Sequence, residues 1–128
     1  MPNYMLLLYA QDLDDADQAA RWGDMPEWLA LTRRLRETGL LVSNGTLHGV
    51  DVATTVRVRG RETELTDGPF AVTKEVLVGY YVLECDDLDV ALEQAAWLPT
   101  ARYGSVEIRP VMDLGEIPNE NVGSWPPV

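Results

Sequence analysis

The chain has 128 residues, a formal net charge of −11 and a single cysteine. This length suits one domain with its own core, and the acidic balance disfavours contact with a phosphate backbone, so we predict no nucleic-acid partner. A lone cysteine excludes an internal disulfide. The apolar run near the N-terminus is too short for a membrane span and lacks the basic flank of a signal peptide. We therefore expect a cytoplasmic protein without a membrane partner.

The first predicted elements are a strand and a helix. The apolar run YMLLLY, residues 4–9, predicts a strand that is covered on both faces. From Pro26 onward, apolar residues recur at intervals of three and four, which predicts a helix that ends at Gly39. Asp24 is placed to cap this helix, and Glu27 completes an arrangement like a capping box.

A strand and a hairpin are predicted next. Residues 40–47 are compatible with a strand. The alternation in TTVRVR, residues 54–59, and the polar ETELT, residues 62–66, predict two strands joined by a tight turn around Gly60.

The remaining pattern is strand, helix and strand. LVGYYVL, residues 77–83, predicts a buried strand. Residues 88–98 predict a helix that Asp86 or Asp87 caps and that ends before a proline, and residues 105–111 alternate as a last strand.

Residues 113–128 form a tail whose last part is rich in proline, glycine and asparagine. This composition is typical of a disordered segment or of one laid across a partner surface. Trp125 favours the second, because an aromatic side chain gains nothing in a free tail. We therefore divide the chain into a domain, residues 1–112, and a tail that we expect to pack on a partner subunit.

The order of these elements predicts an α+β fold. Two helices of similar length cover one face of an antiparallel sheet, which is the ferredoxin-like β-α-β-β-α-β arrangement with an extra hairpin. The strands at residues 4–9 and 77–83 carry apolar side chains at both parities, so the other face also needs a cover. A second copy is the simplest cover, and we predict a homodimer whose sheets pack face to face.

The stretch TDGPFAVTKE, Thr66–Glu75, resembles the DGPF-type motif of the YCII-related proteins. YMLLLY is similar to the first strand of that family, RRLRETGLL to the end of its first helix, and LDVALEQAAWLPTARYGSVEIRPV to its second helix and last strand. The resemblance extends from Asn3 to about Met112 and implies a dimeric α/β barrel. It implies little about chemistry, because the activity of the family is largely unassigned.

The resemblance suggests two kinds of role. Relatives often lie near genes for sigma factors, and some are labelled transcription-initiation proteins. The broader fold includes cofactor-free isomerases, cyclases and monooxygenases that act on small organic molecules. The better-studied YCII proteins are proposed to use a histidine on the first helix and an aspartate near the end of the second. Here EWLALTRRLRE has no histidine and LPTARYG no aspartate, so we do not transfer that dyad.

Three candidate residues lie within TDGPFAVTKE. Asp67 is either a turn residue that bonds its own backbone or an acid–base group facing a cavity between subunits. Phe70 either lines that cavity or fills the core. Lys74 is either a solvated charge or a group that binds an anion.

Four further candidates lie outside that motif or at its end. Glu75 either remains solvated or pairs with Arg109, and Arg109 binds either a carboxylate of the chain or that of a ligand. His48 is either a loop residue or a catalytic base, and Tyr81 either fills the core or offers its phenol to the cavity. No grouping of metal ligands is present in the sequence, so we predict neither a metal nor a cofactor.

Three interpretations of function remain open. In the first, the homodimer binds or transforms a small organic metabolite without a cofactor; as an enzyme it would be an isomerase, cyclase, hydrolase or monooxygenase-like protein. In the second, it is a regulatory or interaction protein that acts through its acidic surface, with residues 12–17 as the main patch, and is linked to transcription. In the third, it is a structural dimer module without a site.

Overall fold

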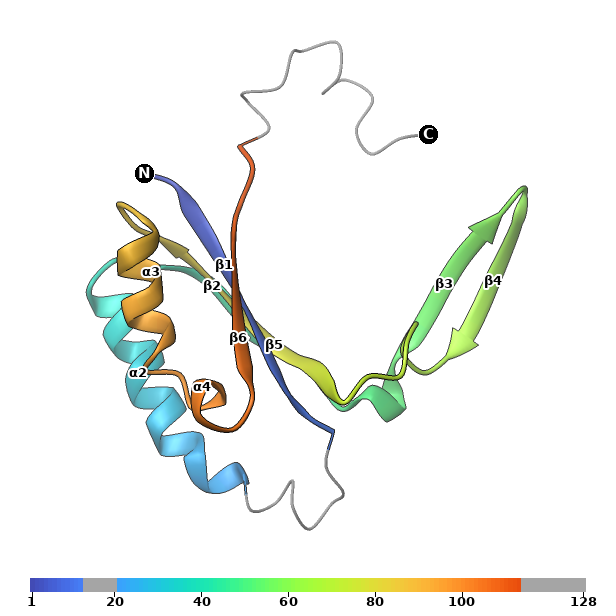
Figure 1. Cartoon of the computed structure of the whole chain (residues 1–128), viewed down its shortest axis with the longest axis horizontal. Helices are drawn as coiled ribbons and strands as arrows, with labels where there is room; N and C mark the ends of the chain where they lie inside the picture. The colour runs from blue at the N-terminus through green and yellow to red at the C-terminus, as the bar shows by residue number, and fades with distance from the viewer. Residues whose placement is uncertain (13–20, 114–128) are drawn as a thin grey trace.

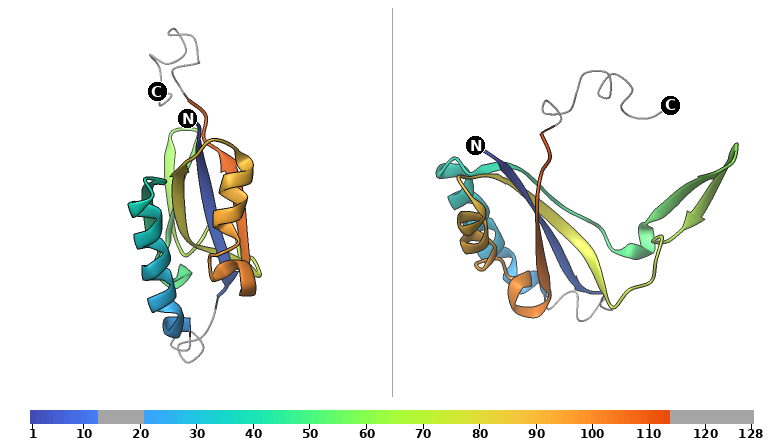
Figure 2. Two further views of the ribbon diagram at one scale, coloured as in Figure 1. Left: turned by 90° about the vertical axis from the view of Figure 1, so that its left-hand side faces the viewer. Right: turned by 45° about the horizontal axis from the view of Figure 1, so that its top comes forward.

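The computed structural model describes residues 1–12 and 21–113 of the chain. Four strands form one antiparallel sheet in the order β2-β5-β1-β6, and three helices lie on one of its faces (Figures 1 and 2). The strands are β1 (Asn3–Gln11), β2 (Leu41–Thr46), β5 (Glu75–Glu84) and β6 (Ser105–Pro110). The helices are α2 (Met25–Glu37), α3 (Leu88–Ala95) and α4 (Thr100–Tyr103), with single turns of 3₁₀ helix at η1 (Trp22–Asp24) and η2 (Val50–Val52).

This strand order is compatible with the predicted ferredoxin-like fold. In that fold the two central strands, here β1 and β5, are neighbours in the sheet but are not consecutive in the sequence. Alternate residues of β1 are buried against the helices, because side chains of a strand point to opposite faces in turn. Leu83, opposite Tyr4 of β1, is 0% exposed. The core therefore lies between the sheet and the helices, with Leu31 and Leu35 of α2 and Ala91 and Ala95 of α3 facing the strands.

The ends of the helices agree only in part with the predicted caps. Gly39 has a φ of +77°, and the N–H of Leu40 donates to the carbonyl of Leu35 at 3.1 Å, so α2 ends as expected. Asp24 is the residue before α2, but its side chain makes no capping hydrogen bond. The predicted capping box was wrong, because Glu27 instead pairs with Arg102 through two contacts of 2.8 Å.

In the second half of the chain, two short helices replace the single helix that was predicted. Asp87 caps α3 by accepting a hydrogen bond from the N–H of Val90 at 3.1 Å. The helix was predicted to continue to residue 98 but ends at Ala95, and the short helix α4 follows Pro99. Proline cannot continue a helix ladder, yet its fixed φ suits the start of a new one.

The hairpin forms a separate two-stranded sheet, β3 (Thr54–Arg59) and β4 (Glu62–Asp67), which we call the arm. It projects away from the side of the main sheet that is opposite the helices (Figure 1). The register pairs Val56 with Leu65, and Val58 lies on the same face of the arm. The other face carries two cross-strand pairs of opposite charge, Arg57 with Glu64 and Arg59 with Glu62. The arm is thus amphipathic, and Leu65 is 70% exposed.

The face of the main sheet that lies away from the helices is apolar at its centre, and we call it the open face. It carries half-buried side chains from β1 and β5, with Leu7 opposite Tyr80 and Met5 opposite Val82. Among the described residues, no helix covers it (Figure 2). The apolar side chains of these strands therefore lie on two surfaces: one set faces the core and the other set faces the open face.

We expect Gly104→Ala to destabilise the protein by about 1–3 kcal/mol, as overpacked core variants do. A Cβ at this position would collide with the backbone of β1 at Tyr9 and Ala10, which cannot move as a side chain would. Urea unfolding followed by circular dichroism measures the change. Gly23→Ala is the matched control, because no described atom lies within 4 Å of the added carbon. Equal losses in the two variants would contradict the steric explanation.

Candidate functional site

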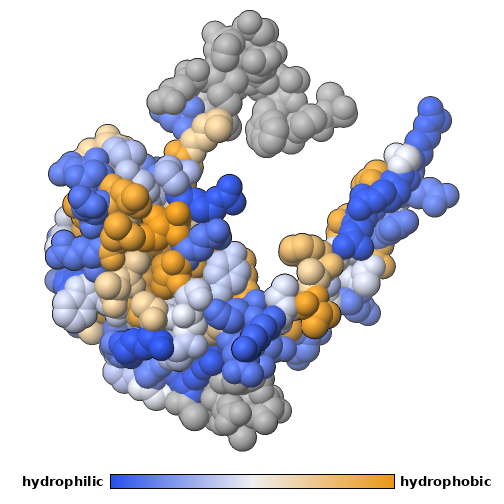
Figure 3. All heavy atoms as spheres, in the orientation of Figure 1, coloured by the Kyte–Doolittle hydropathy of each residue, from blue (hydrophilic) through white to orange (hydrophobic). Residues whose placement is uncertain are grey.

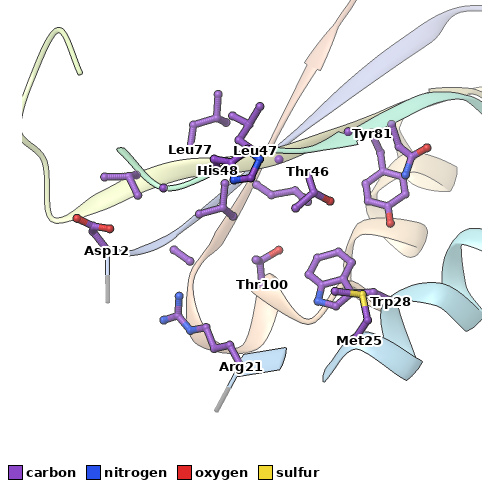
Figure 4. A pocket seen from close by; sticks show the side chains of 18 of the residues that line it. Asp12, Arg21, Met25, Trp28, Thr46, Leu47, His48, Leu77, Tyr81 and Thr100 are labelled. Carbon is purple, nitrogen blue, oxygen red and sulfur yellow. The ribbon is translucent and has the colours of Figure 1, made fainter. Parts of the chain in front are cut away.

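A cavity of about 660 Å³ lies on the helix side of the sheet and is the candidate site. We call it the helix-side cavity. Its walls come from α2, from the ends of β2 and β5, from β1 and from the start and end of α4 (Figure 4). This volume is within the range of clefts that hold small organic ligands.

One wall of the helix-side cavity is aromatic. The rings of Trp28 and Tyr81 are stacked with centroids 6.3 Å apart and planes 9° apart. The hydroxyl of Thr32 donates its only hydrogen to the carbonyl of Trp28 at 2.8 Å. The 2.6 Å bond between Thr32 and Tyr81 must therefore use the hydrogen of Tyr81. Burial raises the pKa of Tyr81, so this phenol is neutral at physiological pH.

Thr100 is a polar residue of the cavity lining. It is the first residue of α4 and is 1% exposed. Among the described residues, no hydrogen-bond partner for its Oγ1 is present. Figure 4 shows Thr100 between Arg21 and Trp28, below the wall that carries Thr46 and His48. A buried polar atom without a partner is rare in folded proteins, and one that lines a cavity points to a ligand or an ordered water.

Arg21 supplies a positive charge beside Thr100. Its guanidinium lies 4.5 Å from the centre of the Tyr103 ring, and its Nη1 donates to the carbonyl of Gln11 at 3.0 Å. These two contacts hold the plane of the guanidinium at the cavity. Burial and the charge of Asp24 raise the pKa of Tyr103, against the opposing effects of Arg21 and of the hydrogen bond with Trp28.

Two of the residues predicted from the sequence line this cavity. Tyr81 is buried in its aromatic wall. His48 lines the cavity from the loop that follows β2. The hydrogen bond from Leu47 N–H to the carbonyl of Val78, 2.9 Å long, extends the pairing of β2 with β5 and so fixes the start of this loop. Asp51 also lines the cavity.

Asp67, Phe70 and Lys74 lie elsewhere, on the arm and the segment that joins it to β5. Phe70 is 77% exposed, and the other two are exposed as well. The turn itself is held by groups other than Asp67. Thr55 Oγ1 donates to the carbonyl of Gly68 at 2.8 Å, and Gly68 N–H donates to the carbonyl of Ala53 at 2.7 Å. Gly68 has a φ of +98°, the conformation that makes glycine the natural residue here.

Glu75 and Arg109 lie on the main sheet but outside the helix-side cavity. The carboxylate of Glu75 accepts from Ser105 Oγ at 2.7 and 3.2 Å. Arg109 pairs with Met5 of β1 and Glu75 with Gln11, which places them about 20 Å apart along the strand at roughly 3.3 Å per residue. Of the two alternatives for Glu75, pairing with Arg109 is therefore excluded within one chain.

The profile of the YCII-related domain matches residues 3–115. The chain belongs to the YCII-related family. An uncharacterised protein of Rhizobium meliloti (strain 1021) is 39% identical to it over 99 residues, which cover 74% of this chain and 80% of that protein. The family resemblance predicted from YMLLLY, TDGPFAVTKE and the flanking segments is thus confirmed.

Two further properties of this YCII-related protein follow from the described residues. Within residues 1–12 and 21–113, no helix is both long and apolar enough to cross a membrane. The same part of the chain holds no group of three histidine, cysteine, aspartate or glutamate side chains that would bind a metal ion. Of the acidic patch predicted at residues 12–17, only Asp12 is described, and Trp125 in the predicted tail also lies outside the described residues.

Three main residues of the site in this YCII-related protein were not predicted from the sequence. Arg21 and Trp28 lie around the start of α2 and Thr100 is distant in the sequence, so they line one cavity only in the folded chain. The one available signal was LPT at the end of the second predicted helix, where a threonine directly follows a proline. That signal predicts the start of a new helix. It does not predict that the threonine lines a cavity.

We expect Thr100→Val to raise the free energy of unfolding of this YCII-related protein by about 1 kcal/mol, because it removes a buried hydroxyl that lacks a partner. Thr100→Ser is the matched control: it keeps the hydroxyl and loses the methyl group, which should lower the same quantity. Urea unfolding of the ligand-free protein gives both values. A loss of stability in the valine variant would mean that the hydroxyl is satisfied.

Proposed function

We propose that this protein binds or transforms a small organic molecule, without a cofactor, in the helix-side cavity. The observation that carries the proposal is the buried, unpartnered Oγ1 of Thr100 at the wall of a cavity of about 660 Å³. A core selected only for stability would fill such a space or replace the hydroxyl with a methyl group. Stability is given up here at one polar atom, as is common at binding sites.

The other walls support the same proposal. The stacked Trp28 and Tyr81 offer flat apolar rings, while Arg21 and Thr100 offer hydrogen-bond donors in the same lining. A mostly apolar cavity with a few placed polar groups is the usual form of a small-molecule site. For a transforming enzyme, His48 is the acid–base candidate within this cavity, and Asp67 stays a prediction that requires another site.

A thermal-shift screen against aromatic and carboxylate metabolites tests this proposal. A ligand of the native state raises the melting temperature according to RT ln(1 + [L]/Kd), which is about 2.7 kcal/mol at a hundred times Kd. We expect hits with the natural protein and weaker shifts with Thr100→Val. No hit across a broad library, or shifts that Thr100→Val leaves unchanged, would refute this site.

We also propose, as the DGPF-type resemblance implies, that the chain works as a homodimer of the α/β barrel type. An isolated two-stranded hairpin is at best marginally stable in water, and the arm has an exposed apolar face. The centre of the open face is apolar as well. The space-filling view shows hydrophobic side chains on the arm (Figure 3). A two-fold symmetric partner would cover both surfaces with the same surfaces of its own.

Light scattering of the purified protein tests the homodimer. We expect the mass of two chains for the natural protein and of one chain for Leu65→Glu, which puts a charge on the apolar face of the arm. Thr66→Glu is the matched control, because Thr66 neighbours Leu65 but points to the polar face. A monomeric natural protein would refute the dimer, and a dimeric Leu65→Glu variant would remove the arm from its interface.

A further inference from the structure

We infer that the ligand of the helix-side cavity is a small carboxylic acid with a flat, apolar body. The inference rests on the proposed function and adds the chemical class of the molecule. It comes from two groups of side chains that line the cavity, one polar and one aromatic, and from the charges among the lining residues.

The polar end fits a carboxylate. Arg21 is held by the ring of Tyr103 at 4.5 Å and by the carbonyl of Gln11 at 3.0 Å, so its guanidinium is positioned before a ligand arrives. Only one of its five N–H donors is used by that carbonyl. Thr100 lines the same cavity with a hydroxyl that has no hydrogen-bond partner among the described residues. A planar guanidinium matches the two oxygens of a carboxylate, and a free hydroxyl in the same cavity is a further possible donor.

The arginines and aspartates that line the cavity balance one another. Among the described lining residues, Arg21 and Arg36 are the arginines, and Asp12 and Asp51 are the aspartates. These four charges cancel, so the site offers no excess positive charge to a phosphate dianion. Asp12 directly follows Gln11, whose carbonyl Arg21 binds, so a carboxylate with one negative charge meets less repulsion next to Arg21 than a dianion would.

The apolar part fits a flat body. Trp28 and Tyr81 are within 9° of parallel, and Leu8 and Ala10 of β1 line the same cavity. Aromatic walls stack well on planar rings and less well on puckered ones. A volume of about 660 Å³ admits more than one ring. A polar, flexible acid would leave this surface without a partner.

Calorimetric titration with a matched pair of probes tests the class of ligand. Naphthalene-2-carboxylate and naphthalene-2-carboxamide share the same flat body and differ in charge. We expect the carboxylate to bind the natural protein at least tenfold more tightly than the amide. Arg21→Gln should reduce the carboxylate to the affinity of the amide and change the amide little, while Thr100→Val should weaken the carboxylate severalfold.

Arg33→Gln is the matched control variant, because Arg33 is an exposed cation of α2 that does not line the cavity, and it should leave both affinities unchanged. Equal or tighter binding of the amide would overturn the carboxylate class and leave the proposed function intact. Failure of both probes, when the broad screen gives other hits at the same cavity, would do the same. Failure of both probes together with an empty screen would overturn the proposed function as well.

Discussion

The structure depends on the central strand β1. Neighbouring strands pair with both of its edges, and its two faces contact different surroundings. β1 pairs with β5 on one side and with β6 on the other, so its backbone groups are satisfied along most of its length. One set of its side chains forms the floor of the core, and the other set forms the centre of the open face. A shift of register by one residue would exchange these two sets and remove the helix packing, the cavity wall and the open face together.

The helix-side cavity lies where this regular arrangement ends. The register of β1 with β5 shifts between Leu8 and Tyr9, and the residues of β1 that line the cavity, Leu8, Ala10 and Gln11, lie on both sides of this point. A bulge turns side chains away from the regular pleat and is common next to binding sites. The cavity is lined by residues of α2 from Met25 to Arg36, whereas Leu31 and Leu35 of the same helix are buried in the core against the sheet.

Much of this fold follows from periodicity alone. The strand at residues 54–59 was predicted with its observed bounds, because alternation and a glycine turn are local signals. The glycine at the end of α2 and the aspartate cap of α3 are equally local. The capping box at Glu27 failed because Arg102, distant in the sequence, competes for the same carboxylate. This pair lowers the pKa of Glu27, chiefly through the hydrogen bonds from Arg102.

The site is the part that periodicity could not predict. A cavity leaves no pattern in the sequence. Thr100, Arg21 and Trp28 become candidate site residues only because the folded chain places them around the same cavity. TDGPFAVTKE attracted attention because it is dense in charged and turn-forming residues, yet its bonds hold the base of the arm. A motif that is conspicuous in sequence can thus be architectural, while the groups around a cavity look ordinary one by one.

The base of the arm has a consequence for how such a chain can change. Ala53 and Gly68 are joined by a backbone hydrogen bond of 2.7 Å, so the arm leaves and re-enters the domain at nearly one point. Residues can therefore be added to or deleted from the arm without altering the spacing of β2 and β5. The length of the arm can therefore change while the residues that line the helix-side cavity keep their places in the fold.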